Sequence, residues 1–191
     1  MIILIVIAAA LIATLLWVAW TYNRLIALRL GCESSWAQID VALKLRHDLV
    51  PVIAEAVAGY AGHERRTFDE VAEARGGAIA ANDANPAARG AQEGLFGSKL
   101  GRMMILAEDY PELRATENFS ALQSDLGELE EKISITRRVY NDTVERYNTQ
   151  TQVFPPVLVA RTFGFEAREF FEAPAGAEVA PTISLQTGAG G

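Results

Sequence analysis

The chain has 191 residues, half of them apolar, and its formal net charge is −7 at neutral pH. Such an acidic protein is a poor candidate for binding nucleic acid or for lying flat on anionic lipid, so no nucleic-acid partner is expected. The single cysteine, Cys32, excludes an internal disulfide and a cysteine metal cluster.

An apolar run opens the chain. Residues 2–20 contain Thr14 as their only polar side chain, and this length is enough to cross a hydrocarbon core as a helix. A secretory signal peptide is the competing interpretation, but it would have a positive n-region and a shorter apolar core. The sequence therefore predicts a transmembrane anchor at residues 1–21, in contact with the lipid bilayer through residues 2–20.

The end of the anchor carries interface residues. Trp17, Trp20 and Tyr22 lie where amphipathic rings prefer the lipid–water boundary. Arg24 and Arg29 follow, and no Lys or Arg precedes the span. By the positive-inside bias, the bulk of the chain is expected in the cytoplasm and a very short N-terminus outside.

A helical stalk follows the anchor. Its apolar residues recur every three or four positions and form one stripe, which partner helices must cover. The stripe comprises Tyr22, Leu25, Cys32, Trp36, Ile39, Leu43, Val50, Ile53, Val57 and Tyr60. Pro51 removes one backbone donor, but the stripe keeps its phase beyond it, which favours a kink over a break.

Two shorter helices are predicted next, near residues 63–81 and 95–108. Between them, residues 82–94 are mostly Asn, Asp, Pro, Gly and Ala with little apolar mass, which is typical of a mobile loop.

A second long helix is predicted from Thr116 to the Pro155-Pro156 step. It matches the stalk in length, so the two can lie antiparallel, but the shorter helices cover only the distal half. We therefore expect residues 157–171 to fold back on the base as a short helix and turn, with Gly164 at the bend. The alternative is that its phenylalanines dip into the lipid interface, which the acidic residues Glu166, Glu169 and Glu172 disfavour.

The predicted fold class is all-α. An N-terminal transmembrane helix continues into an antiparallel bundle of about four helices, two long and two shorter, over residues 22–172. The Ala-, Gly- and Pro-rich residues 173–191 are predicted to be a flexible C-terminal tail.

Polar residues interrupt the apolar stripes. The candidates for a site are Asp40, Arg46, Asp48, Arg137, Asn141 and Asn148. Tyr140-Asn141 and Tyr147-Asn148 lie seven residues apart, so the pair repeats on one helix face. The favoured interpretation is a buried interhelical polar ladder that sets helix register, and the alternative is a partner surface. Asp125, Glu128, Glu130 and Glu131 are interpreted as a solvated helix face.

His47-Asp48 and His63-Glu64 are the combinations that resemble catalytic or metal-binding residues. They do not form an HExxH motif, because Thr67 stands where its second histidine belongs. Interhelical or exposed hydrogen bonding is the default, so no catalytic residue, metal or other cofactor is predicted.

Long stretches of the chain resemble the LemA family of bacterial membrane proteins. They are YNRLIALR, SSWAQIDVALKLRHDLVPVIAEAVAGYAGHE, AEDYPELRATENFSALQSDLGELEEKI, RRVYNDTVERYNTQTQVFP and FGFEAREFFEAP. The resemblance implies a single-pass protein of the bacterial inner membrane, a cytoplasmic-facing helical bundle and no established enzymatic activity.

The leading hypothesis is a non-enzymatic, membrane-anchored scaffold or adaptor whose bundle binds partners or copies of itself. A homo-oligomer is expected because Ala8, Ala9, Ala10 and Ala13 let anchor helices approach closely. The alternatives are a membrane-associated hydrolase that uses His47, Asp48, His63 and Glu64, and an accessory subunit of a membrane protease or envelope-stress system.

Overall fold

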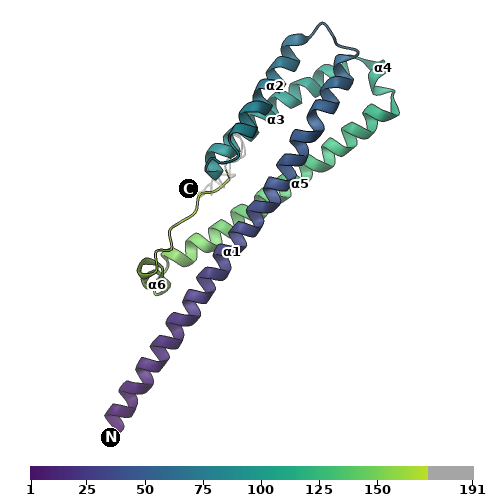
Figure 1. Ribbon diagram of the computed structural model, residues 1–191. Helices are drawn as coiled ribbons and strands as arrows, with labels where there is room; N and C mark the ends of the chain where they lie inside the picture. Colours follow the sequence, from purple (N-terminus) through teal and green to yellow (C-terminus); the bar gives the residue numbers. More distant parts are fainter. Residues whose placement is uncertain (172–191) are drawn as a thin grey trace, which may run out of the picture.

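The computed structural model describes residues 1–171, which form six helices and no strand (Figure 1). The all-α class is confirmed for this part of the chain. The helices are α1 (Ile2–Ala58), α2 (Arg65–Ala80), α3 (Pro86–Glu108), α4 (Pro111–Arg114), α5 (Glu117–Gln152) and α6 (Pro156–Thr162). Within the described range, α1 is the one helix long and apolar enough to cross a membrane.

Helix α1 is continuous over 57 residues and includes Pro51. Because proline has no N–H, the carbonyl of His47 loses the donor that the next turn would supply. Nε of Arg75, on α2, donates to this carbonyl at 2.8 Å. The bond from α2 replaces the missing helix bond, and the buried residues Ile53 and Val57 hold the turns beyond the proline.

Helices α1 and α5 run antiparallel along the length of α5 (Figure 1). Thr116 begins α5, as predicted, because its Oγ1 accepts a hydrogen bond from Phe119 N at 3.4 Å. The two helices bury a shared core beside the extended segment that ends the described chain. That core comprises Cys32, Ile39, Ala42, Leu43, Leu129, Ile133, Tyr140, Val144, Tyr147 and Phe171.

Helices α2 and α3 form a hairpin over the distal half of α1. The predicted loop at residues 82–94 is wrong, because α3 already begins at Pro86. Asn85 Oδ1 caps it by accepting from Ala88 N at 2.8 Å, and proline suits the first helical position. The buried face of the first turns carries Arg89, Gly90 and Glu93, so it lacks the apolar stripe by which helices are recognised.

The chain folds back at the base of the bundle, as predicted for residues 157–171. Helix α6 packs on α1, and Gly164 makes the bend with φ = 70°, a conformation that favours glycine. An extended segment, residues 165–171, then returns along α1 and α5. Phe165 and Phe171 pack against the core, whereas Phe163 and Phe170 stay exposed. The tail predicted at residues 173–191 lies outside the described residues.

Candidate functional site

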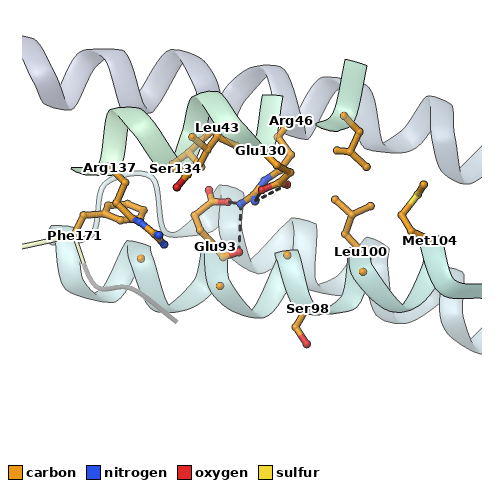
Figure 2. Close-up of a pocket in the computed structure, with 16 residues that line it drawn as sticks. Leu43, Arg46, Glu93, Ser98, Leu100, Met104, Glu130, Ser134, Arg137 and Phe171 are labelled. Carbon is orange, nitrogen blue, oxygen red and sulfur yellow. Dashed lines mark hydrogen bonds and ion pairs between the residues drawn. The ribbon is translucent and has the colours of Figure 1, made fainter. Parts of the chain in front are cut away.

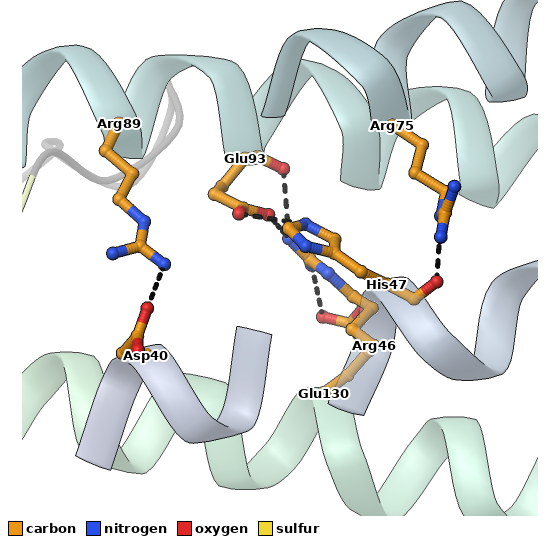
Figure 3. A network of polar contacts seen from close by, with 7 residues as sticks. All are labelled: Asp40, Arg46, His47, Arg75, Arg89, Glu93 and Glu130. Carbon is orange, nitrogen blue, oxygen red and sulfur yellow. Dashed lines mark hydrogen bonds and ion pairs between the residues drawn. The ribbon is translucent and has the colours of Figure 1, made fainter. Parts of the chain in front are cut away.

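A cluster of charged residues joins three helices in the middle of the bundle (Figure 3). Arg46 of α1 and Glu93 of α3 are 4% and 3% exposed, and Arg46 Nη2 lies 2.5 Å from Glu93 Oε2. The other terminal nitrogen of Arg46, Nη1, donates to Glu130 of α5 at 3.0 and 3.2 Å from its two oxygens. Arg46 therefore connects α3 to α5 through α1.

His47 completes the cluster. Its Nε2 lies 3.0 Å from Glu93 Oε1, although the N–H is poorly aligned for a hydrogen bond. The guanidinium of Arg46 lies 5.2 Å from the centre of the Phe96 ring, and the imidazole of His47 lies 5.5 Å from it. Burial alone would raise the pKa of Glu93, but contact with His47 and the charge of Arg46 outweigh burial, so this pKa lies below the ordinary carboxyl value.

A second ion pair lies next to this cluster. Buried Arg89 of α3 binds Asp40 of α1 through Nη2, and its guanidinium lies 5.2 Å from the centre of the Trp36 ring. Asp40 itself is exposed, so this pair connects the inside of the bundle to its surface. The pair holds the first turn of α3 on α1, where few apolar contacts are present.

A groove of about 480 Å³ lies between α3 and α5, with Arg46 and Leu43 of α1 at its floor (Figure 2). Four glycines of α3 line it at spacings of four, three and four: Gly90, Gly94, Gly97 and Gly101. A Cβ added at Gly97 would lie 3.6 Å from Arg46 Nη1, and one at Gly101 would meet nothing within 4 Å. The glycines thus keep this helix face open.

The lining of the groove is mixed. Its apolar residues include Leu100, Met104, Leu126, Ile133 and Phe171, and its polar residues include Glu93, Ser98, Glu130, Ser134 and Arg137. An apolar lining with a few polar groups is typical of a ligand-binding site.

Asn141 and Asn148 hold the extended segment rather than another helix. Asn148 Nδ2 donates to Arg168 O, and Arg168 N donates to Asn148 Oδ1, both at 2.8 Å. Asn141 makes the same pair of bonds with Phe171, at 3.1 and 2.9 Å. Seven residues of helix and three residues of extended chain each span about 10 Å, so the two asparagines match the two backbone positions.

Tyr140 and Tyr147 accompany these amides. The hydroxyl of Tyr140 donates to Glu169 O at 3.0 Å, between the two asparagine contacts. Burial raises the pKa of Tyr140 to about 12, and burial also raises the pKa of Tyr147, so both remain neutral donors near pH 7. The ladder predicted from the Tyr-Asn repeat is therefore a clamp on a backbone segment of the same chain.

The remaining predicted polar residues are dispersed. Asp48 is exposed beside a hollow of about 320 Å³ between α1 and α2, and Arg137 is half-buried at the groove. His63 and Glu64 lie exposed in the turn before α2. From His47 to Ala58, where that turn begins, α1 rises about 16 Å, so His47 and His63 are not brought together.

The sequence analysis missed four residues of this candidate site, which are Arg75, Arg89, Glu93 and Glu130. Glu93 and Arg89 fell in the segment interpreted as a loop. Asp125, Glu128 and Glu131 are exposed as predicted, whereas Glu130, whose side chain is 42% exposed, also binds Arg46. A signal was present, because residues 89, 93, 96, 100, 103 and 107 alternate steps of four and three after an Asn-Pro helix start. Arg75 is detectable only through its tertiary partner.

Neither a metal-binding group nor a reactive thiol is found among the described residues 1–171. Within residues 1–171, no group of three His, Cys, Asp or Glu side chains is arranged to hold a metal ion. Cys32 is buried in the core, and burial raises the pKa of its thiol, which disfavours the nucleophilic thiolate.

The predicted anchor residues meet the returning chain. Trp17 packs against α6, and the Tyr22 ring lies 5.0 Å from Phe163 and 5.6 Å from Phe165 between ring centres. Trp20 is exposed, with the guanidinium of Arg24 at 5.6 Å from its ring.

Two comparisons relate the chain to known proteins. The sequence model of the LemA family matches residues 35–185. Magnetosome protein MamQ 2 of Paramagnetospirillum magneticum is 24% identical over 201 residues, covering 92% of this chain and 73% of the relative. Magnetosome protein MamQ of Magnetospirillum gryphiswaldense is 21% identical over 192 residues, covering 87% of this chain and 71% of the relative.

Proposed function

Since the chain belongs to the LemA family, we propose that it is a membrane-anchored, non-enzymatic scaffold or adaptor. Helix α1 crosses the bilayer of the bacterial inner membrane once, with a short N-terminus outside and the bundle in the cytoplasm. The groove between α3 and α5 receives a protein partner. The anchors associate side by side and give a homo-oligomer.

One observation carries the proposal. The exposed apolar turns at the start of α1 and the turns that bury one face in the bundle belong to one unbroken helix. Every side chain from residue 1 to 16 is exposed, and a soluble protein rarely exposes so continuous an apolar surface. A rigid helix of this kind holds the groove at a set height above the membrane.

Three residues suited to chemistry, Arg46, His47 and Glu93, contact one another inside the bundle, which supports a structural role for them. Arg46 and Glu93 neutralise each other's charge, His47 contacts the same carboxylate, and all three are buried. Groups matched in this way stabilise the bundle and leave little driving force for proton transfer to a substrate.

Photo-crosslinking in the native membrane tests the groove. A photoreactive residue in place of Ser98, at the groove, is compared with one in place of Glu128, which is exposed elsewhere on α5. We expect a discrete protein adduct at position 98 alone, and its loss when Gly101→Leu fills the groove. Identical adducts at both positions, or an adduct that survives Gly101→Leu in a folded protein, would contradict the proposal.

A second experiment addresses the hydrolase alternative. His47→Gln and His63→Gln together remove both imidazoles while keeping polar side chains. We expect the cellular phenotype of the native protein to persist when the double variant accumulates to the native level, and its loss at that level would favour an enzyme.

A further inference from the structure

The membrane-facing end of the bundle carries an exposed apolar surface. Three large apolar side chains on α6 and directly beside it are exposed. Phe154, Leu158 and Phe163 are 79%, 56% and 52% exposed. Large side chains gathered in this way on a soluble domain mark a surface that contacts something else.

The position of α6 identifies what that partner is. Its buried face, Val159 and Ala160, packs with Leu25, Trp17 and Val18 of α1. Trp17 and Val18 belong to the apolar run proposed to cross the bilayer, about one helical turn inside its end at Trp20. Figure 1 shows α1 continuing beyond α6 with no other helix beside it. Helix α6 therefore lies at the depth where the anchor enters the lipid.

The charges at this end are segregated from those of the rest of the chain. Residues 1–32 and 146–165, which form the base, contain four arginines and no carboxylate side chain. The arginines are Arg24, Arg29, Arg146 and Arg161. The other 13 of the 17 basic residues and all 24 acidic residues lie elsewhere in the chain. The base is therefore cationic, although the net charge of the whole chain is −7.

Of the acidic residues that argued against lipid contact, Glu166 borders this base and Glu169 lies farther along the segment that leaves it. Gly164 turns the chain, and the segment with Glu166 and Glu169 returns along the bundle. At Arg168 this segment lies beside Glu33 of α1, and Arg168 Nη2 donates to Glu33 Oε1 at 2.8 Å. Glu33 lies 13 residues beyond Trp20, a rise of about 20 Å from the predicted interface.

From this geometry we propose that α6 is an interfacial element, and that its partner is the anionic phospholipid leaflet crossed by α1. Phe154, Leu158 and Phe163 enter the boundary between headgroups and acyl chains, and Arg161 and Arg24 face lipid phosphates. The bundle is then held to the membrane at two points, by α1 and by α6, which fixes its tilt. This inference rests on the proposed anchor.

Fluorescence quenching on the full chain tests it. The protein carries Cys32→Ala and a single new cysteine labelled with an environment-sensitive dye, in nanodiscs of phosphatidylcholine and phosphatidylglycerol at a ratio of about three to one. The probe positions are Leu158→Cys at α6, Leu11→Cys within the anchor and Ser124→Cys at the distal end. Two quenchers are used: a lipid with a spin label close to its headgroup, for the comparison of Leu158→Cys with Ser124→Cys, and a lipid with a spin label deep in its acyl chain, for Leu11→Cys.

We expect quenching at Leu158→Cys to exceed that at Ser124→Cys by at least roughly twofold, since only the former probe is at lipid depth. Equal quenching at Leu158→Cys and Ser124→Cys, together with strong quenching at Leu11→Cys, would overturn the proposed lipid contact of α6 and leave the proposed anchor intact. Weak quenching at Leu11→Cys would overturn the anchor and the inference together.

Two variants separate packing from lipid contact. Phe154→Ser with Phe163→Ser removes exposed side chains, so the helical content should persist while quenching at Leu158→Cys falls. Arg161→Glu should reduce quenching more in discs with phosphatidylglycerol than in discs of phosphatidylcholine alone. Unchanged quenching in the first variant would contradict apolar insertion, and an equal effect in both lipids would contradict recognition of anionic headgroups.

Discussion

Arg46 has two acidic partners from different helices and an aromatic ring beside its guanidinium. Burying a charge is costly unless it is paired, so Glu93 and Glu130 make this position tolerable. Each acidic partner comes from a different helix, so the cluster forms only when α1, α3 and α5 are aligned. At the scale of single residues, the cluster thus specifies which helices meet and in which register.

Glu93→Gln tests this cluster by leaving the shape of the side chain nearly unchanged and removing its charge. We expect a loss of about 3 kcal/mol in the free energy of unfolding, because a buried arginine and histidine then face a neutral group. Urea unfolding followed by circular dichroism measures the loss. Glu128→Gln, on the exposed face of α5, is the matched control, and a loss of equal size there would contradict this account.

The pH dependence of stability follows from the same residue. The pKa of Glu93 is lower in the folded chain than in the unfolded chain, so its contribution is present above the unfolded value, about 4.3. The contribution is lost as the pH falls through the folded pKa. We therefore expect the difference in unfolding free energy between the native protein and Glu93→Gln to be smaller below about pH 4 than at about pH 5. An increase of this difference below about pH 4 would contradict a lowered pKa of Glu93 in the folded chain.

At the scale of elements, two helices depend on contacts from outside themselves. Helix α1 passes through Pro51 because Arg75 of α2 binds the carbonyl of His47. Helix α5 holds the extended segment because Asn141 binds the N–H and the carbonyl of Phe171, and Asn148 binds those of Arg168. In both places a side chain satisfies backbone groups that would otherwise be left without a partner inside the protein.

Arg75→Met should destabilise the bundle by about 1–2 kcal/mol, because the carbonyl of His47 loses its donor. In a Pro51→Ala background the same change should cost clearly less, since an alanine at that position supplies the helix N–H. Unfolding free energies of the four proteins give the coupling directly. Equal losses in the two backgrounds would mean that Arg75 acts through packing alone.

Asn148→Ala should lower the stability by about 1–3 kcal/mol, because the N–H and carbonyl of Arg168 both lose a partner. Hydrogen exchange at the Arg168 amide should accelerate more than exchange in the middle of α5. Asp142→Ala, at a position of the same helix that makes no such bond to the segment, is the control. A melting temperature that stays at the native value would argue that the segment is held without the amide.

At the scale of the whole molecule, the chain is a long helix with a bundle built around its second half. The base of the bundle lies beside the turns of α1 that leave the apolar run, and the α2–α3 hairpin lies at the other end (Figure 1). This arrangement separates the groove between α3 and α5 from the base that we propose to contact lipid.

Orientation across the membrane is the prediction at this scale. Arg24 and Arg29 lie on one side of the anchor only, which should keep the bundle in the cytoplasm. A reporter that is active only outside the membrane, fused after Gly191, should remain silent. Replacing both arginines with glutamate should raise its activity, and a reporter that is already active in the native fusion would overturn the orientation.

The sequence by itself determined the anchor-like run, the two long helices, the N-terminal cap of α5 and the fold-back at Gly164. These features depend on local periodicity, on helix-capping residues and on lengths that must match. Only the tertiary structure revealed α3 from its start, because its first buried turns carry Arg89, Gly90 and Glu93 in place of apolar side chains. Their burial depends on charges from Asp40 and Arg46, about fifty residues earlier in the chain. The same holds for the asparagine clamp, whose partner is a backbone segment, and backbone groups have no signature in an amino-acid sequence.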